Sequence, residues 1–214
     1  MRRGAQVGTL GVNEQGAATD GIVLDHGNGV VIYPAPDSVY AVSTMVLFLD
    51  FDGVLHPDAA FLVKGRPTLK TTGELFMWAP LLVELLADLP EVQIVLSTSW
   101  ARALTFDRAR RWLPQELHSR VIGSTWHSAM SVNREGLRNL ATWWDEATRY
   151  QQIKRYAGRA GLSNWVAIDD QPEGWGADDL DKLVHTNCET GLSDPAALAL
   201  LAARLEGLRK PEPC

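Results

Sequence analysis

The sequence contains few cysteines and no long apolar run. Only Cys188 and Cys214 occur among 214 residues, which excludes a disulfide framework and suits a reducing compartment. The longest run of small apolar residues, 196–203, is far too short to span a bilayer. Arg2 and Arg3 are not followed by an apolar stretch, so no signal peptide is indicated. We therefore expect a soluble cytoplasmic protein with no membrane partner.

Positive charge is also in short supply. The chain has 20 Lys and Arg against 26 Asp and Glu, a net charge of −6, which argues against bulk attraction to nucleic acid or membranes. Between Arg102 and Arg159, however, eleven Lys or Arg accompany five Asp or Glu, a local charge of about +6. This basic segment would suit an anionic substrate, or it is an ordinary solvated helix surface.

Residues 1–44 differ in composition from the rest of the chain. They are rich in Gly and Ala, and we expect an N-terminal extension that is either disordered or a weak hairpin of 22–24 and 30–33. Met45 directly precedes the next apolar stretch, so translation could instead begin there. An intact N-terminus at Met1, detected by mass spectrometry of the native protein, would exclude that hypothesis. The remaining residues can bury one sizeable core.

The most informative stretch is VLFLDFDGVL, residues 46–55. It predicts a buried strand whose alternation directs Asp50 and Asp52 toward one point, with Gly53 allowing a sharp turn. Two facing carboxylates repel each other unless a cation lies between them or one stays protonated. Both solutions suit phosphoryl transfer. A calcium loop is the alternative, but its later ligand positions hold residues such as Val54 and Phe61, which offer no side-chain oxygen.

Two further apolar strands are followed by polar residues. Residues 92–96 precede Ser97, Thr98 and Ser99, whose hydroxyls can donate to phosphate oxygens or cap a helix. Residues 165–168 precede Asp169 and Asp170. Because open α/β sheets bind ligands at the carboxyl ends of their strands, we expect all three strand ends to converge on one gap the size of a magnesium ion.

The intervening segments alternate with these strands. Residues 80–89 have helical periodicity that Pro90 ends, 104–112 and 114–118 predict short helices, and 133–158 predicts a helix broken near Ala147 and Thr148. A last helix begins near Ser193, whereas 57–73 is interpreted as polar and irregular. The pattern predicts a three-layer Rossmann-like α/β domain with a mostly parallel sheet.

Together the motifs resemble the haloacid dehalogenase-like (HAD) superfamily of phosphohydrolases, and within it the small HAD domain associated with Swiss Army Knife RNA repair proteins. The resemblance rests on LFLDFDGVLHP, LSTSW, WVAIDD and GLS, and covers about residues 45–208. It implies that residues 45–210 form a HAD-like catalytic domain. Only about 45 residues separate Asp52 from Ser97, so the resemblance allows no more than a minimal cap.

Position by position, the resemblance implies specific roles. Asp50 would be the nucleophile that forms an aspartyl-phosphate, and Asp52 the general acid and base, with its backbone carbonyl on Mg²⁺. Ser97 would hydrogen-bond the phosphoryl group. Asp170 would ligate the metal, and Asp169 would do so directly or through water. The implied cofactor is therefore Mg²⁺, held by Asp50, Asp52, Asp169 and Asp170.

The lysine that usually neutralises the phosphate in this superfamily has no unambiguous equivalent here. Lys154 is slightly favoured over Arg149, which lies nearer the start of its helix. Arg102 is separated from Trp100 by Ala101, which weakens its match to a phosphate clamp. The residues expected on the substrate side are Gly53, Thr98, Ser99 and Arg102.

The expected activity is a Mg²⁺-dependent phosphohydrolase acting on phosphate monoesters through an aspartyl-phosphate. Two alternatives stay open: a phosphatase that processes nucleic-acid ends in RNA repair, and a catalytically silent binding module that keeps the fold. The phosphorylated substrate is thus a small molecule or a nucleic-acid end. His118, His127 and His185 are too scattered to indicate a zinc site. His56, beside Pro57, is interpreted as part of a turn.

Overall fold

The computed structural model describes residues 21–25, 30–34, 44–131 and 143–209. The chain divides into two units, residues 1–43 and 44–214, which are described one at a time. In the first, β1 (Gly21–Asp25) and β2 (Val30–Pro34) pair antiparallel, with Gly21 opposite Pro34. This pair lies where the sequence predicted a weak hairpin.

The second unit is built on a five-stranded parallel sheet with the order β7-β6-β3-β8-β9. The central strand, β3, is the predicted key strand and is buried at every position. The strand bounds are β3 Met45–Leu49, β6 Val92–Leu96, β7 Val121–Ser124, β8 Trp165–Asp169 and β9 Leu183–His185. The predicted Rossmann-like α/β class with a parallel sheet is therefore confirmed.

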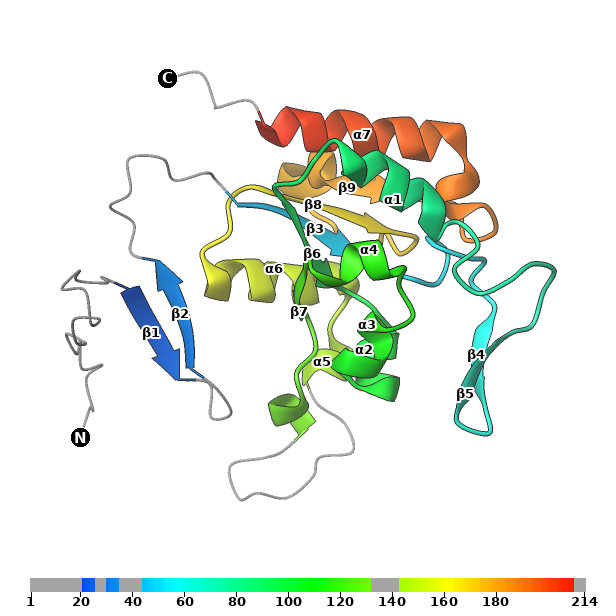
Figure 1. The fold of residues 1–214 in the computed structure, drawn as a ribbon, viewed down its shortest axis with the longest axis horizontal. Coiled ribbons are helices and arrows are strands. Elements are labelled where there is room, and N and C mark those ends of the chain that lie inside the picture. Colours follow the sequence, from blue (N-terminus) through cyan, green and yellow to red (C-terminus); the bar gives the residue numbers. More distant parts are fainter. Residues whose placement is uncertain (1–20, 26–29, 35–43, 132–142, 210–214) are drawn as a thin grey trace. The chain divides into compact units, whose positions relative to one another are not determined.

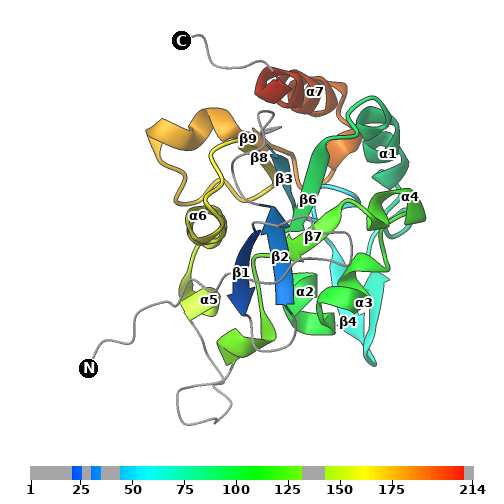
Figure 2. The same ribbon diagram turned by 60° about the vertical axis from the view of Figure 1, so that its left-hand side comes forward.

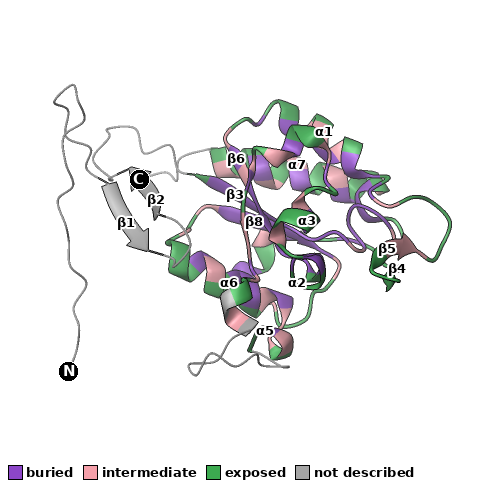
Figure 3. Ribbon diagram, turned by 60° about the horizontal axis from the view of Figure 1, so that its bottom comes forward, coloured by how far each residue is buried: buried purple, intermediate pink, exposed green. Residues whose placement is uncertain are grey.

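Helices cover both faces of this sheet, as Figures 1 and 2 show. On one face, α1 (Ala79–Ala87) and α7 (Pro195–Arg209) pack their leucines against the alternate β3 residues Met45, Leu47 and Leu49. On the other face, α6 (Arg149–Ala160) packs against Val46 and Phe48. Alternate side chains of β3 therefore pack into two separate hydrophobic cores, one on each face of the sheet. Figure 3 shows the strands buried between the helical layers.

The helical region after β6 begins earlier than the sequence predicted. The expected helix over 104–112 is α3 (Phe106–Arg110), and α2 (Ser99–Leu104), which precedes it, was not predicted. Thr105, with φ of 93°, separates the two, because a helix cannot continue through a positive φ. The short predicted helix over 114–118 is confirmed as α4 (Gln115–His118).

The predicted break near Ala147 and Thr148 is confirmed. It separates α5 (Trp143–Glu146) from α6, while the part of that prediction over 133–142 lies outside the described residues. Thr148 caps α6 through a reciprocal capping box with Gln151. None of the helices in the described ranges has both the length and the apolar character needed to cross a membrane.

One segment was predicted wrongly. Residues 57–73 are not irregular but contain an antiparallel hairpin of β4 (Ala60–Val63) and β5 (Arg66–Leu69). Its two turn residues, Lys64 and Gly65, both have positive φ, which is typical of the type I′ turn that suits a twisted hairpin. Pro67 within β5 obscured the strand pattern. This hairpin is the only strand pair that the described residues insert between β3 and α1.

Candidate active site

Three carboxylates meet where β3 and β8 end. These strands are adjacent and parallel, with Leu49 paired to Ile168, so the residues that follow them emerge side by side. Asp50, Asp169 and Asp170 each present an oxygen, and these oxygens all lie within 4.8 Å of one another. Oxygens that share one Mg²⁺ lie up to about 4 Å apart, so small rotations would complete such a site. Convergence of these strand ends was the central expectation from the sequence.

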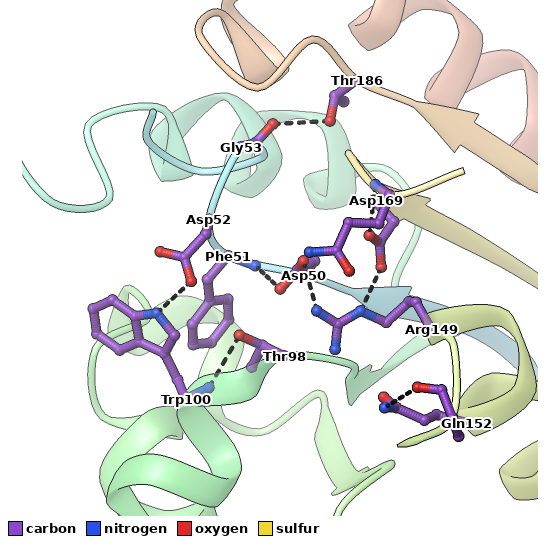
Figure 4. A network of polar contacts seen from close by, with 12 residues as sticks. Asp50, Phe51, Asp52, Gly53, Thr98, Trp100, Arg149, Gln152, Asp169 and Thr186 are labelled. Carbon is purple, nitrogen blue, oxygen red and sulfur yellow. Dashed lines mark hydrogen bonds and ion pairs between the residues drawn. The ribbon is translucent and has the colours of Figure 1, made fainter. Parts of the chain in front are cut away.

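Arg149 lies against two of these carboxylates (Figure 4). It is the first residue of α6, immediately after the Thr148 cap. Its Nη2 donates to Asp50 Oδ2 at 3.1 Å, and its Nε lies 3.0 Å from Asp169 Oδ2, an ion pair without hydrogen-bond alignment. Its side chain is only 7% exposed. Burial alone would lower the pKa of Arg149, but the surrounding carboxylates, Asp50 and Asp169 foremost, together raise it, so the guanidinium remains charged.

Lys154, the slightly favoured cation, lies elsewhere. Its Nζ is 2.6 Å from Asp179 Oδ2, an oxygen that also accepts from the hydroxyl of Tyr150. No ion pair joins Lys154 to Asp50 or Asp169 in the described part of the chain. Positions five apart on a helix are rotated by about 140°, so Lys154 and Arg149 cannot face the same point. The structure therefore brings Arg149, and not the slightly favoured Lys154, to the carboxylate cluster.

The cluster carries more negative charge than the protein compensates. Burial is the main factor that raises the pKa of Asp50 to about 6 and that of Asp170 to about 7, and it raises the pKa of Asp169 well above its usual range. When all three are ionised, Arg149 balances one charge and leaves two. Asp170 Oδ1 has no hydrogen-bond partner, and Asp169 Oδ2 has only its ion pair with Arg149. A net charge of −2 and carboxylate oxygens that accept no hydrogen bond fit a hard divalent cation such as Mg²⁺.

Gly53 shapes the turn that closes the site. It has φ of 67°, and a Cβ added to it would lie 2.4 Å from Asp170 Oδ2. Its carbonyl accepts a hydrogen bond of 2.8 Å from the hydroxyl of Thr186. The predicted sharp turn is therefore present, and only a glycine allows the backbone to pass this close to Asp170.

Asp52 does not join the cluster, contrary to the expectation that both aspartates point to one spot. Its Oδ2 accepts from Trp100 Nε1 at 2.8 Å (Figure 4), and its Oδ1 lies 3.1 Å from His56 Nε2. Strand alternation no longer applies here, because β3 ends at Leu49 and a turn follows. The sequence therefore predicted the wrong direction for this side chain.

The hydroxyls after β6 take separate positions. Ser97 is fully buried beside β3, where its N–H donates to the Leu49 carbonyl and its hydroxyl has no partner. Thr98 caps α2, because its hydroxyl accepts from the N–H of Trp100 at 3.3 Å. Of the two roles left open for the hydroxyls, the structure shows the helix cap for Thr98.

A shallow groove lies beside Asp52, between the β4–β5 hairpin and α2. Ser99, the first residue of α2, is exposed and lines it. Arg102 does not line it. The Arg102 guanidinium forms an ion pair with Asp145 and lies 6.0 Å from the Trp144 ring centre, so the structure does not bring Arg102 to the cluster. The groove is lined by Asp52, Ala60, Phe61, Leu62, Pro67, Ser99, Trp100, Ala103 and Leu104.

Sequence reasoning missed two neighbours of the site. Trp100 is the last residue of the LSTSW motif, and its place just after the polar strand end was the one available signal, although the motif does not show that the indole donates to Asp52. Thr186 donates to the Gly53 carbonyl across 133 positions of sequence, and no local pattern can predict such a contact.

Comparison with known proteins adds one match. The sequence profile of the family described as HAD domain in Swiss Army Knife RNA repair proteins matches residues 46–197. This range contains Asp50, Arg149, Asp169 and Asp170, all four members of the charged cluster. No curated protein matches the chain.

Proposed function

Because the chain belongs to the family of HAD domains in Swiss Army Knife RNA repair proteins, we propose that it is a Mg²⁺-dependent phosphohydrolase. It cleaves phosphate monoesters through an aspartyl-phosphate. The observation that carries this proposal is the cluster of Asp50, Asp169 and Asp170 at the ends of two parallel strands, with Arg149 on two of the three. Burying three carboxylates beside one guanidinium costs free energy unless a further cation offsets their charge.

Asp50 is the nucleophile in this proposal. The N–H of Phe51, at 2.7 Å, and Arg149 both donate to the Asp50 carboxylate and hold it in one orientation. The carboxylate is therefore already positioned to attack phosphorus. A bond forms between an Asp50 oxygen and phosphorus while the bond from phosphorus to the leaving oxygen breaks. Water then attacks phosphorus, the bond between phosphorus and the Asp50 oxygen breaks, and inorganic phosphate leaves with the Asp50 carboxylate restored.

Asp52 supplies and recovers the proton. It protonates the leaving oxygen in the first step, and in the second its carboxylate takes a proton from the attacking water. The position of Asp52 outside the charged cluster supports this role, because the carboxylates inside the cluster are the ones placed to bind the metal or attack phosphorus.

The cationic groups balance the charge of the phosphoryl group. Arg149 is charged, buried and already in contact with Asp50, so it reduces the repulsion between that carboxylate and an incoming dianion. Asp50, Asp169 and Asp170 would hold Mg²⁺, which when bound neutralises phosphate oxygens. The buried Ser97 hydroxyl, which lacks a partner, is available to donate to the phosphoryl group.

Substitution of the nucleophile tests the mechanism. Asp50→Asn removes the attacking charge with little change of shape, so we expect turnover of para-nitrophenyl phosphate to fall to the blank rate. Asp107→Asn is the matched control, because Asp107 has a side chain 68% exposed on α3. Full activity of Asp50→Asn, with both variants folded by melting temperature, would contradict the covalent mechanism.

A nucleic-acid end is the second candidate substrate. The description of the family, which names RNA repair proteins, favours it, and the short β4–β5 hairpin leaves less over the site than an inserted domain would. We expect a 3′-phosphorylated oligonucleotide to be a better substrate than small sugar phosphates. Its KM should rise with salt if phosphates along the chain contribute to binding. Equal KM at two salt concentrations would favour a small molecule.

The basic segment supports this candidate less than its charge suggested. Arg149 and Arg102 are engaged with carboxylates inside the domain. Arg120 donates to the backbone carbonyls of Leu86, Leu89 and Val92. These cations stabilise the fold, so the salt dependence of KM should be shallow.

A further inference from the structure

The carboxyl group of Asp52 is held by two nitrogen atoms from different parts of the chain. Trp100 Nε1 lies 2.8 Å from Oδ2, and His56 Nε2 lies 3.1 Å from Oδ1. The indole nitrogen can only donate, so its N–H holds Asp52 Oδ2 in one position. Each carboxyl oxygen offers two lone-pair positions, which leaves a free position on each for a proton or a substrate.

His56 can serve as the second donor. It is fully buried, and its Nδ1 has no hydrogen-bond partner. Buried N–H groups without a hydrogen-bond partner are rare, so the tautomer that carries its hydrogen on Nε2 fits the site better than the one that carries it on Nδ1. In that tautomer Nε2 donates to Asp52.

The Trp100 ring cannot turn away from this position. It is 6% exposed and lies edge-on to Phe51, Phe76 and Trp112, with ring centres 5.7, 5.3 and 5.6 Å away. Edge-to-face contacts at these separations stabilise one ring orientation. The indole N–H is thus aimed at Asp52 by packing that is independent of the hydrogen bond itself.

Asp52 and Trp100 both line the groove beside the β4–β5 hairpin. The Asp52 side chain is 18% exposed, whereas that of Asp50 is 2% exposed. Asp52 is therefore the more accessible of the two, and it can be reached from the groove that it lines. A leaving group that extends from phosphorus into this groove would receive a proton there.

We propose that Trp100 and His56 are positioning residues that hold Asp52 ready to protonate the leaving group in this groove. The inference rests on the proposed function and deepens it. As the bond to phosphorus breaks, its electron pair stays on the leaving oxygen, which takes the proton of Asp52. The resulting carboxylate is then stabilised by two N–H donors that are already in place.

Leaving groups of different acidity test the proposal. Trp100→Phe keeps the aromatic packing but removes the donor. It should lower kcat for an alkyl phosphate, which needs protonation, about tenfold more than kcat for para-nitrophenyl phosphate, which needs little. The matched control is Trp112→Phe, which alters the same aromatic cluster without touching Asp52. It should leave the ratio of the two kcat values unchanged.

His56 provides an independent variant should Trp100→Phe fold poorly. His56→Gln can place an amide N–H near the position of Nε2, whereas His56→Leu cannot donate. Gln should retain the wild-type ratio and Leu should lose it. A purely structural role would lower both kcat values equally, which would overturn the inference. Wild-type protein that hydrolyses neither ester would instead overturn the proposed function, and this inference with it.

Discussion

At the scale of single residues, Arg149 shows why burial and charge must be considered together. The guanidinium contacts Asp50 and Asp169 in a region from which water is largely excluded. Loss of one partner from such a group leaves buried carboxylates uncompensated, at a cost of about 3–5 kcal/mol. The raised pKa of both carboxyls allows proton uptake to offset part of that cost. Lys154, by contrast, is 47% exposed, and its buried partner Asp179 also contacts Lys182 and the Tyr150 hydroxyl, so loss of Lys154 does not leave Asp179 uncompensated.

The contrast can be measured with Arg149→Met and Lys154→Met. We expect the free energy of unfolding, from urea titration without Mg²⁺, to fall by about 3 kcal/mol for Arg149→Met and by less than about 1 kcal/mol for Lys154→Met. Turnover should be lost only in Arg149→Met, because of these two cations only Arg149 contacts Asp50, the proposed nucleophile. A larger loss of turnover in Lys154→Met would reverse the assignment of the phosphate-neutralising cation.

At the scale of elements, two turns have the same backbone requirement but different surroundings. Gly53, after β3, has φ of 67° and faces Asp170, whereas Gly65, between β4 and β5, has φ of 76° with no atom within 4 Å of an added Cβ. The left-handed conformation costs about 1–2 kcal/mol for a residue with a Cβ. Only at Gly53 does a steric clash add to that cost.

Alanine at each position separates these two effects. Gly65→Ala should lower the free energy of unfolding by about 1 kcal/mol and leave the melting-temperature increase caused by Mg²⁺ intact. Gly53→Ala should lower stability further and abolish that increase, because Asp170 must move. Both quantities come from thermal unfolding with and without Mg²⁺. An unchanged Mg²⁺ response in Gly53→Ala would show that Asp170 does not ligate the metal.

At the scale of the whole molecule, the acidic cluster links stability to pH. Asp50, with its pKa near 6, and Asp170, with its pKa near 7, bind protons more tightly in the folded protein than in the unfolded chain, where the value is about 3.8. Their contribution to stability is therefore complete at low pH and is lost as pH rises through 6 and 7. Asp179 behaves oppositely, since its pKa is lowered by Lys154, but its stabilisation is lost only below about pH 4.

Metal-free protein should therefore become less stable between about pH 5 and pH 8, by at least about 4 °C in melting temperature. Mg²⁺ competes with protons for the same oxygens, so the increase in melting temperature that it causes should grow over this range. Asp170→Asn should flatten both trends. Melting curves at several pH values with EDTA or with Mg²⁺ provide the measurement. A catalytically silent module without a metal site would show no response to Mg²⁺.

Much of this molecule could be predicted from local patterns. The strands β3, β6 and β8 are short and apolar, and they lead into Asp50, Ser97 and the Asp169–Asp170 pair. Their existence and their shared edge therefore followed from periodicity and parallel-sheet geometry. The hairpin at 60–69 escaped prediction, because Pro67 and exposed apolar side chains disguised its alternation.

Residue order alone was sufficient for the α/β class, the position of the sheet edge and the three acidic residues that meet there, because those features depend on backbone periodicity. It was insufficient for choosing Arg149 over Lys154 and for seeing that Asp52 turns toward Trp100. Those outcomes depend on how α6 and α2 pack against β3. Arg149 lies 99 positions along the chain from Asp50, and Trp100 lies 48 positions from Asp52. Side-chain direction at a site is set by the packing of distant elements, and no local pattern contains that information.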